Sequence, residues 1–262
     1  MRTFTVDPAV FEKLPDYCLG VVTVEGFDNS RGDPRIAQML DGAAADFAAR
    51  HAGENVRELP GVKACREAFQ TLGMNPNKFM VSIEALAKRV QKGAALPHIN
   101  PLVDLGNAFS LRYEIPLGAH DIDRMEPCGI AVRFSAEGDS FLPMGEETAE
   151  VMPEGELCYV SGRTVKTRRW MWRQSEDGKI TPETRHVFFP LDGFADVNGD
   201  AVLAARDALA AFLRDELGLT VRLGKTFSCR HPAAQSKAWW NRQQGCWSIQ
   251  EPLLQSLPGS CR

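Results

Sequence analysis

Asp104, Asn107 and Ser110 are three polar residues that recur at helical spacing in one apolar segment. Asn100 precedes a proline and predicts a turn into this segment, because the residue before proline is held out of the helical conformation. In a helix, side chains three or four residues apart share one face. A polar face among leucine, valine and phenylalanine needs hydrogen-bonding partners or a ligand. The alternative is structural, with Asp104 capping the helix and Asn107 satisfying buried backbone groups.

A glycine-bearing loop follows over residues 115–123 and places His120 beside Asp121, two positions after Gly118. A neighbouring carboxylate can orient an imidazole and raise its basicity, so the loop is a candidate for proton transfer. The alternative is a surface loop in which Asp121 acts as a cap.

A cluster of positive charges is interleaved with tryptophan between residues 163 and 173. Its members are Arg163, Lys166, Arg168, Arg169 and Arg173, together with Trp170 and Trp172. A strand over 164–174 would put Arg169 and Arg173 on one face and both tryptophans on the other. One interpretation is a phosphate-binding patch with an aromatic ring that stacks on a base. The other is a tryptophan core face beneath a solvated arginine face.

The elements that must hold these residues are predicted from hydrophobic spacing. Apolar, β-branched residues over 18–24 predict a buried strand. Helical spacing predicts helices after Asp33, over 62–72 and over 82–90. Short strands are predicted over 131–135, 157–160, 164–174 and 186–191.

The helix predicted over 201–217 is rich in alanine and leucine and ends at a glycine. Its apolar face is expected to cover a sheet through Leu203, Leu209, Phe212, Leu213 and Leu217. Beyond it, residues 226–262 have no periodicity and are predicted to be an irregular tail. Cys229, His231 and Cys246 in this tail are too scattered to predict a metal site.

Composition limits the class of protein. The chain has 262 residues, 44% of them hydrophobic, and a formal charge of −4, so contact with a nucleic acid must come from a local patch. Seven scattered cysteines without a Cys-x-x-Cys pair argue against a disulfide framework and a zinc site. Neither a signal peptide nor a bilayer-length apolar run is present in the sequence, which favours the cytoplasm. No cofactor is predicted, and the sequence indicates no oligomeric state.

Four segments in order resemble the B3/B4 editing domain of the phenylalanyl-tRNA synthetase β subunit, and still more its free-standing relatives, a family that includes a canavanyl-tRNA(Arg) deacylase. The segments are residues 79–86, 98–121, 153–156 and 169–174. The resemblance implies an α/β (α+β) layered fold with sheets or a sandwich flanked by helices. It also implies one editing domain over 1–225, with an N-terminal α/β portion over about 1–95 and a core over about 96–220.

The resemblance carries over to the site residue by residue. Asn107 matches an asparagine of the synthetase editing pocket, whereas the pocket histidine falls on Gly118 and His120 stands where the synthetase has an aromatic residue. The pocket glutamate that reads the tyrosine hydroxyl falls near Pro190, with Asp192 two residues on. These departures argue against tyrosine as the substrate and, with nearby carboxylates, favour a cationic amino acid.

The resulting assignment has three parts. The catalytic candidates are Asn107, His120 and Asp192. The candidates for substrate binding are Asn100, Asp104, Ser110, Gly118, Asp121, Glu156 and Thr184. The candidates for binding the tRNA acceptor end are Arg163, Arg168, Arg169, Trp172 and Arg173.

The expected function is hydrolysis of mischarged aminoacyl-tRNA, possible without a covalent nucleophile because the ester is already activated. The terminal ribose hydroxyl is a further candidate to assist. Two alternatives are a module that binds tRNA or another RNA without hydrolysis, and a small-molecule hydrolase or binding protein that reuses the pocket.

Overall fold

The N-terminal part of the chain supplies one inner strand to each of two sheets. The computed structural model describes residues 2–224, 227–228, 237–241 and 246–250. Strand β1 (Arg2–Val6) and helix α1 (Pro8–Lys13) precede strand β2 (Tyr17–Glu25). Eight of the nine residues of β2 are buried, so the predicted strand over 18–24 is confirmed.

Four helices follow, and each begins with a proline or a serine within two residues of a predicted start. They are α2 (Pro34–Arg50), α3 (Pro60–Thr71), α4 (Ser82–Gln91) and α5 (Pro101–Tyr113), with a short 3-10 turn η1 (Val56–Glu58) before α3. Side chains of Asp33 and Asn100 accept hydrogen bonds from the first turns of α2 and α5, respectively. Proline suits a first helical turn, where its missing N–H would have no partner. The predicted helices are confirmed.

The smaller sheet has the strand order β11–β2–β10–β3 among the described residues, and β12 also pairs with β2. The new strands are β11 (Thr220–Leu223), β10 (Val187–Phe194), β3 (His120–Asp121) and β12 (Phe227–Ser228). All eight residues of β10 are buried. Because β10 pairs with β2 over the full length of β10, residues before 95 and residues after 186 form one sheet.

Helix α6 (Gly199–Ala211) packs on this sheet and continues as one wide turn, η3 (Phe212–Glu216). Its buried face contains Val202, Ala205 and Leu209. The prediction that Leu203 belongs to this face is wrong, since its side chain is exposed. Neighbouring helical residues point about 100° apart, so burial of Val202 turns Leu203 toward solvent.

The larger sheet has the order β14–β13–β1–β4–β7–β8–β5–β6 within the described residues, and β9 pairs with β8. Its further strands are β4 (Gly129–Phe134), β5 (Ser140–Phe141), β6 (Glu150–Val151), β7 (Leu157–Ser161), β8 (Thr164–Arg168), β9 (Arg173–Gln174), β13 (Lys237–Asn241) and β14 (Cys246–Gln250). A 3-10 turn, η2 (Ile122–Arg124), links β3 to β4. The expected α/β fold with sheets flanked by helices is confirmed.

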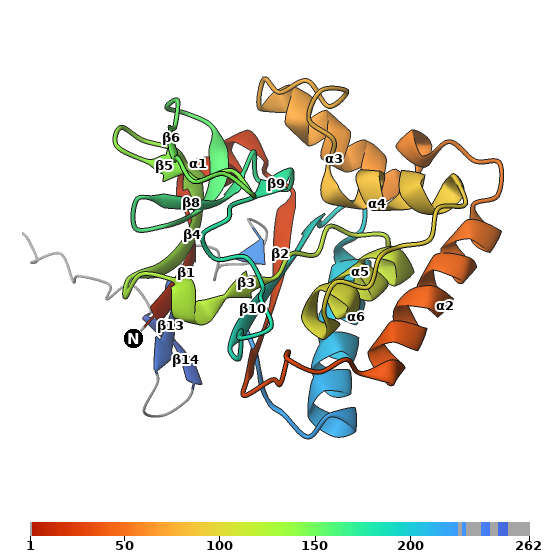
Figure 1. Cartoon of the computed structure of the whole chain (residues 1–262). Helices are drawn as coiled ribbons and strands as arrows, with labels where there is room; N and C mark the ends of the chain where they lie inside the picture. The colour runs from red at the N-terminus through yellow and green to blue at the C-terminus, as the bar shows by residue number, and fades with distance from the viewer. Residues whose placement is uncertain (1, 225–226, 229–236, 242–245, 251–262) are drawn as a thin grey trace, which may run out of the picture.

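Figure 1 shows the strands of the larger sheet on one side of the molecule and helices α2 to α6 on the other, with β2 and β10 between them. Tyr17, Phe188 and Trp170 are buried in one hydrophobic cluster that extends from the larger sheet to α3 and α4. The candidate site lies where these layers meet.

The continuous strand predicted over 164–174 is wrong. Strand β8 ends at Arg168, and Arg169 and Trp170 have φ angles of 48° and 59°. These left-handed residues turn the chain, so strand alternation does not extend through the tryptophans. Trp170 is fully buried, whereas Trp172 is half-buried.

The predicted irregular tail over 226–262 falls mainly outside the described residues. The described parts at 237–241 and 246–250 pair as strands β13 and β14. Cys229 and His231 lie outside the described residues, and the side chain of Cys246 is not described. Among the helices in the described part of the chain, none has both the length and the apolar character needed to cross a membrane.

Candidate functional site

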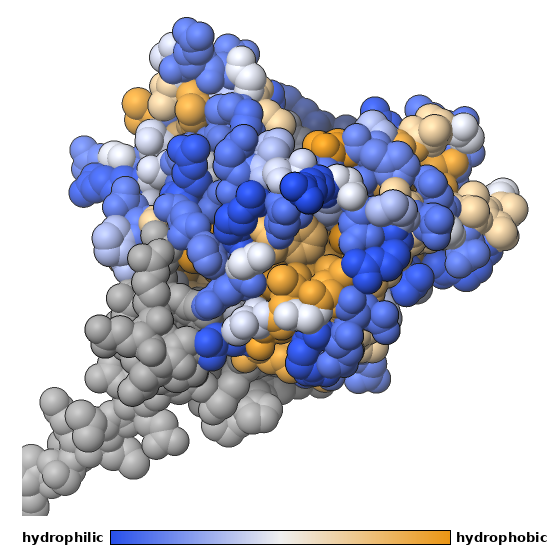
Figure 2. Space-filling view, turned by 60° about the horizontal axis from the view of Figure 1, so that its bottom comes forward, coloured by the Kyte–Doolittle hydropathy of each residue, from blue (hydrophilic) through white to orange (hydrophobic). Residues whose placement is uncertain are grey.

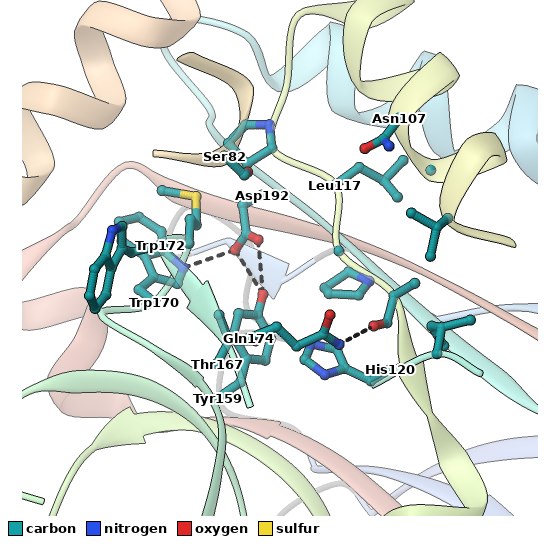
Figure 3. Close-up of a pocket in the computed structure, with 18 of the residues that line it drawn as sticks. Ser82, Asn107, Leu117, His120, Tyr159, Thr167, Trp170, Trp172, Gln174 and Asp192 are labelled. Carbon is teal, nitrogen blue, oxygen red and sulfur yellow. Dashed lines mark hydrogen bonds between the residues drawn. The ribbon is translucent and has the colours of Figure 1, made fainter. Parts of the chain in front are cut away.

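A cavity of about 190 Å³ lies between helix α5, the loop before β3, and strands β7, β8 and β10. Hydrophobic side chains gather on the face seen in Figure 2, and the apolar lining of the cavity includes Leu102, Val103, Leu117, Ile180 and Pro190. The polar lining consists of Ser82, Asn107, His120, Tyr159, Thr167, Gln174 and Asp192 (Figure 3). The structure thus brings together Asn107, Gly118, His120 and Asp192 of the predicted site.

Asp192 is a buried carboxylate in the cavity wall, held by three aromatic donors. Its Oδ1 atom accepts hydrogen bonds from the Tyr17 hydroxyl at 2.6 Å, the Tyr159 hydroxyl at 2.8 Å and the Trp170 indole N–H at 2.9 Å. The Oδ2 atom receives a longer contact of 3.0 Å from the same Tyr159 hydroxyl. Oδ1 is therefore saturated, and Oδ2 keeps accepting capacity.

Burial raises the pKa of Asp192 to about 6, and the hydrogen bonds from Tyr17, Tyr159 and Trp170 limit the rise. The carboxyl group is therefore mostly ionised at neutral pH. No ion pair joins Asp192 to a lysine, arginine or histidine of the described residues. Buried charges in proteins are usually paired, so this carboxylate is suited to a cationic ligand.

His120 is a buried, neutral imidazole in the same wall. Burial lowers its pKa to about 3, and the positive charge of Lys166 acts in the same direction. The ring packs between Tyr159 and Phe188, at centroid distances of 5.4 and 6.1 Å. Its Nδ1 atom has no hydrogen-bond partner among the described residues. A neutral ring of this kind can orient water but is a weak base at neutral pH.

Asn107 extends from the middle of α5 toward the cavity and is half-buried (Figure 3). Its carboxamide makes no hydrogen bond with any residue in the described part of the chain. A side-chain amide has two donors and an acceptor, so Asn107 can bind both a carbonyl oxygen and a water molecule.

Gly118 borders the cavity where a side chain would reduce its volume. A β-carbon at this position would lie 3.3 Å from Cγ of Pro190 and 3.8 Å from Nε2 of His120. The backbone N–H of Gly118 donates to the carbonyl of Pro190 at 3.0 Å, which fixes the loop against β10. The glycine keeps this wall of the cavity open.

Three predicted substrate-binding residues lie on or beside α5 but outside the cavity lining. Asn100 caps the helix by accepting from the N–H of Val103 at 3.1 Å. Asp104 is buried and accepts from the N–H of Ile99 and the His98 ring, at 2.9 and 3.0 Å. Ser110 donates to the carbonyl of Ile115 at 2.6 Å. Their contacts orient the helix that presents Asn107.

Asp121 and Thr184 come together outside the cavity lining. The Thr184 hydroxyl donates to Asp121 at 2.7 Å, and the other oxygen of Asp121 accepts from the N–H of Asp123 at 2.8 Å. Asp121 therefore caps η2, as the structural interpretation expected, and the pair fixes the loop beside His120. The expectation of a surface loop is wrong, because His120 and Asp121 are both buried.

Glu156 forms ion pairs with two arginines of the predicted basic patch. Glu156 pairs with Arg168 at 2.9 Å and with Arg169 at 3.1 Å, and Arg168 also pairs with Glu150 at 2.7 Å. Lys166 is buried and pairs with Asp177 at 2.6 Å. Arg163 donates to the carbonyl of Glu137 at the far end of β8, and Arg173 is exposed.

Comparison with known proteins identifies the family. The B3/4 domain matches residues 64–214, which is more than half of the chain. The chain belongs to the B3/4 domain family. It is 27% identical over 141 residues to a phenylalanine–tRNA ligase β subunit of Synechococcus sp. (strain JA-3-3Ab), a match that covers 52% of this chain and 16% of that protein.

A solved structure is also similar to this B3/4 chain. It is an N-terminal fragment of the phenylalanyl-tRNA synthetase β-subunit from Pyrococcus horikoshii, matched with a TM-score of 0.46 and 12% identity. The match covers 84% of this chain and 50% of the fragment. The chain therefore spans half or less of the length of these relatives.

The aromatic donors to Asp192 in this B3/4 chain were not predicted. Tyr17, Tyr159 and Trp170 lie 175, 33 and 22 positions from Asp192, so no local spacing connects them. A weak signal exists, since tyrosine hydroxyls and indole N–H groups in apolar segments need buried acceptors. The sequence does not reveal which acceptor they meet.

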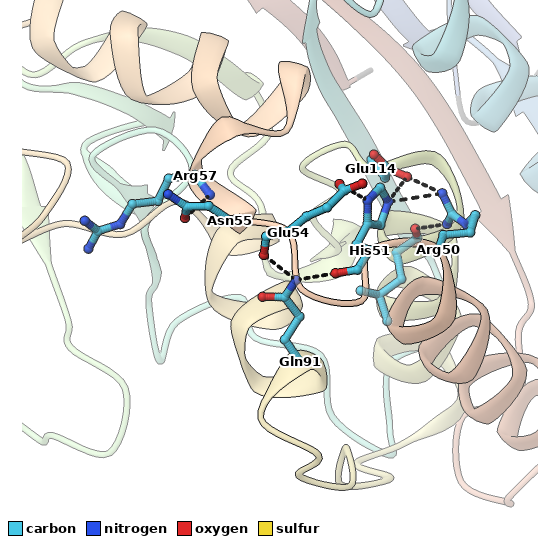
Figure 4. A network of polar contacts seen from close by, with 8 residues as sticks. Arg50, His51, Glu54, Asn55, Arg57, Gln91 and Glu114 are labelled. Atoms are coloured by element: carbon cyan, nitrogen blue, oxygen red, sulfur yellow. Dashed lines mark hydrogen bonds and ion pairs between the residues drawn. The ribbon is translucent and has the colours of Figure 1, made fainter.

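A polar network lies at the C-terminal end of α5, around its C-cap residue Glu114 (Figure 4). His51, after the end of α2, contacts Glu54 at 2.9 Å and Glu114 at 2.8 Å, and Arg50 also pairs with Glu114. Burial lowers the pKa of His51, but the two glutamates outweigh it and raise the pKa overall. Gln91 of α4 donates to the carbonyls of His51 and Glu54. Three helix ends of the B3/4 chain are thereby joined.

Proposed function

We propose that this B3/4 chain is a trans-editing deacylase that hydrolyses aminoacyl-tRNA esters whose amino acid carries a cationic side chain. The family match and the similarity to a phenylalanine–tRNA ligase β subunit support a role on tRNA. A cavity of about 190 Å³ is below the roughly 300–1,000 Å³ of sites for drug-sized ligands, as expected for one amino-acid moiety.

The buried carboxylate of Asp192 is the observation that carries the proposal. It is mostly ionised at neutral pH, has spare accepting capacity on Oδ2 and lacks a cationic partner in the described part of the chain. An ammonium or guanidinium group of the substrate would supply that partner through a charge-assisted hydrogen bond. Asp121 and Glu156, the other predicted carboxylates, are engaged outside the cavity lining.

The proposed reaction needs few groups. The oxygen of a water molecule attacks the ester carbonyl, the bond to the ribose oxygen breaks, and a proton passes to that oxygen. The products are the free amino acid and a tRNA with a free terminal hydroxyl. We assign Asn107 to the ester carbonyl and the water, because its carboxamide is free to donate and to accept. With a pKa of about 3, His120 is better suited to orient water than to take its proton.

The test is a deacylation assay with purified protein and a panel of aminoacyl-tRNAs bearing cationic, aromatic and small neutral amino acids. The expected result is faster release of the cationic amino acids. Asp192→Asn should lower kcat/KM for these esters roughly 10- to 100-fold, the loss expected for one hydrogen bond to a charged group. Asp123→Asn, the same change at a half-exposed residue outside the cavity lining, is the control.

Two results would contradict the proposal. Release of aromatic amino acids alone would show that Asp192 does not select the substrate. Binding of tRNA without any shortening of the ester lifetime would favour the RNA-binding module.

A further inference from the structure

The turn between β8 and β9 contains two consecutive residues in a strained conformation. Arg169 and Trp170 have φ angles of 48° and 59°, a region that residues with bulky side chains avoid. Residues held in this region are strained, and they concentrate at functional sites. The strained turn therefore points to a role in positioning the side chains of Arg169 and Trp170.

The side chains of Arg169 and Trp170 lie in different surroundings. Trp170 enters the core and donates to Asp192 in the cavity wall. The Arg169 guanidinium lies 3.8 Å from the ring centre of Phe79 and 4.9 Å from that of Trp172, and it pairs with Glu156. Burial lowers the pKa of Arg169, although Glu156 opposes the effect. Arg169 is therefore a packed side chain and not a free surface charge.

Trp172 borders the cavity and remains half-buried. Its ring meets Phe79 edge-on at a centroid distance of 5.0 Å and an interplanar angle of 70°. Phe79 and Arg169 together fix the orientation of the indole. A fixed, partly accessible aromatic ring is the kind of surface on which unpaired nucleic-acid bases stack.

The chemistry of the substrate determines where such a surface must lie. In an aminoacyl-tRNA the ester oxygen belongs to the ribose of the terminal nucleotide, and that ribose also carries the base. When the ester is in the cavity, the terminal base must lie at its border. Trp172 lies at that border, and the neighbouring Arg173 is exposed.

We propose that Trp172 stacks on the terminal base of the tRNA acceptor end, with Phe79 and Arg169 as positioning residues and Arg173 as the contact to the adjacent phosphate. The inference rests on the proposed function, because it takes the ligand of the cavity to be an ester of the terminal ribose. It also removes two arginines from the predicted tRNA-binding patch. Arg168 is paired with two glutamates, and Arg163 lies at the other end of β8.

The experiment uses an uncharged acceptor-stem minihelix with 2-aminopurine in place of the terminal adenine. Stacking quenches 2-aminopurine fluorescence, so the readout requires no hydrolysis. We expect quenching by the wild-type protein. Trp172→Ala should remove most of it and weaken binding roughly 5- to 100-fold, the range measured for loss of one stacked base. Trp172→Phe, which retains an aromatic ring, should preserve most of both.

Arg173→Ala and Arg163→Ala form a matched pair of equal charge change. Only Arg173→Ala should weaken binding and reduce its dependence on salt. Phe79→Leu, which keeps an apolar side chain, should reduce quenching less than Trp172→Ala and serves as a second variant if Trp172→Ala unfolds. Circular dichroism identifies unfolded variants.

The outcomes separate this inference from the proposed function. Failure of the wild-type protein to quench, or equal quenching by the wild type, Trp172→Ala and Phe79→Leu, would overturn the stacking site even if deacylation occurs. Quenching that depends on Trp172 without ester hydrolysis would support the stacking site while contradicting the deacylase.

Discussion

The hydroxyl of Tyr17 donates a 2.6 Å hydrogen bond to the carboxylate of Asp192, although 175 positions separate the two residues. The antiparallel pairing of β2 with β10 explains this contact, because it places Tyr17 opposite Phe194 and Leu19 opposite Asp192. A residue near the N-terminus thereby helps to lower the pKa of a cavity residue on a distant strand, against the larger effect of burial. Several consequences of that arrangement can be measured.

Tyr17→Phe should shift the acid limb of the pH–rate profile to higher pH. The hydrogen bond from Tyr17 lowers the pKa of Asp192, so its removal raises that pKa and delays formation of the carboxylate that the cationic substrate needs. The measurement is kcat/KM between pH 5 and pH 8 on a cationic ester. Tyr113→Phe, a hydroxyl removal on α5 away from Asp192, is the control. Coincident profiles for the wild type and Tyr17→Phe would refute the coupling.

The stability of Asp192→Asn relative to the wild type should increase as the pH rises. The pKa of Asp192 is raised from 3.8 in the unfolded chain to about 6 in the fold, so stability is lost as pH rises between these values. An asparagine does not ionise. The difference in unfolding free energy between the variant and the wild type should therefore shift in the variant's favour by about 1.4 kcal/mol from pH 5 to pH 8. Urea unfolding at both pH values measures this difference, and a constant difference would show that burial does not raise the pKa.

His120→Gln should make the protein more resistant to acid. The pKa of His120 falls to about 3 in the fold, against 6.5 in the unfolded chain, so the unfolded state gains a proton that the folded state rejects below pH 6.5. Stability associated with His120 should fall by about 2 kcal/mol between pH 7 and pH 5. Comparison of urea unfolding for the wild type and the variant isolates this contribution. His186→Gln replaces a half-exposed histidine and is the control.

Gly118→Val should raise KM with a smaller effect on kcat. A β-carbon at Gly118 already lies 3.3 Å from Pro190, and the branched methyl groups would project into the cavity. Loss of this space should cost about 10-fold or more in kcat/KM for a long side chain and less for a small one. Gly42→Ala on α2, where a β-carbon meets nothing within 4 Å, is the control. Equal losses with long and short amino acids would indicate that Gly118 does not border the side-chain site.

Much of the fold could be predicted because its signals are local. The apolar run of β2 and the helix caps at Asp33 and Asn100 depend only on residues that are adjacent in the sequence. Short strands such as β7 also follow from their β-branched and aromatic composition. The π-helical turn that follows α6 and the left-handed pair at Arg169 and Trp170 depend on tertiary packing, so spacing alone could not predict them.

The candidate site was predictable only in part. Asn107, Gly118 and His120 lie close together in the sequence and share the cavity, but Asp104 and Ser110, on the same predicted helix face, are used for structural hydrogen bonds. Helical spacing predicts which residues share one face of the helix, but not which residues of other elements that face contacts. Pairing of the arginines with Glu150 and Glu156 likewise depends on how β6 and β7 approach β8.

The pairing of β2 on both of its edges limits how this chain can be shortened. A fragment reduced to the matched residues 64–214 would lack β2, which lies between β10 and β11. One long edge of β10, an apolar strand that includes Pro190 and Asp192, would then be open to water. Open apolar edges recruit other chains into aggregates. A minimal soluble fragment of this protein must therefore extend well beyond the region by which its family is recognised.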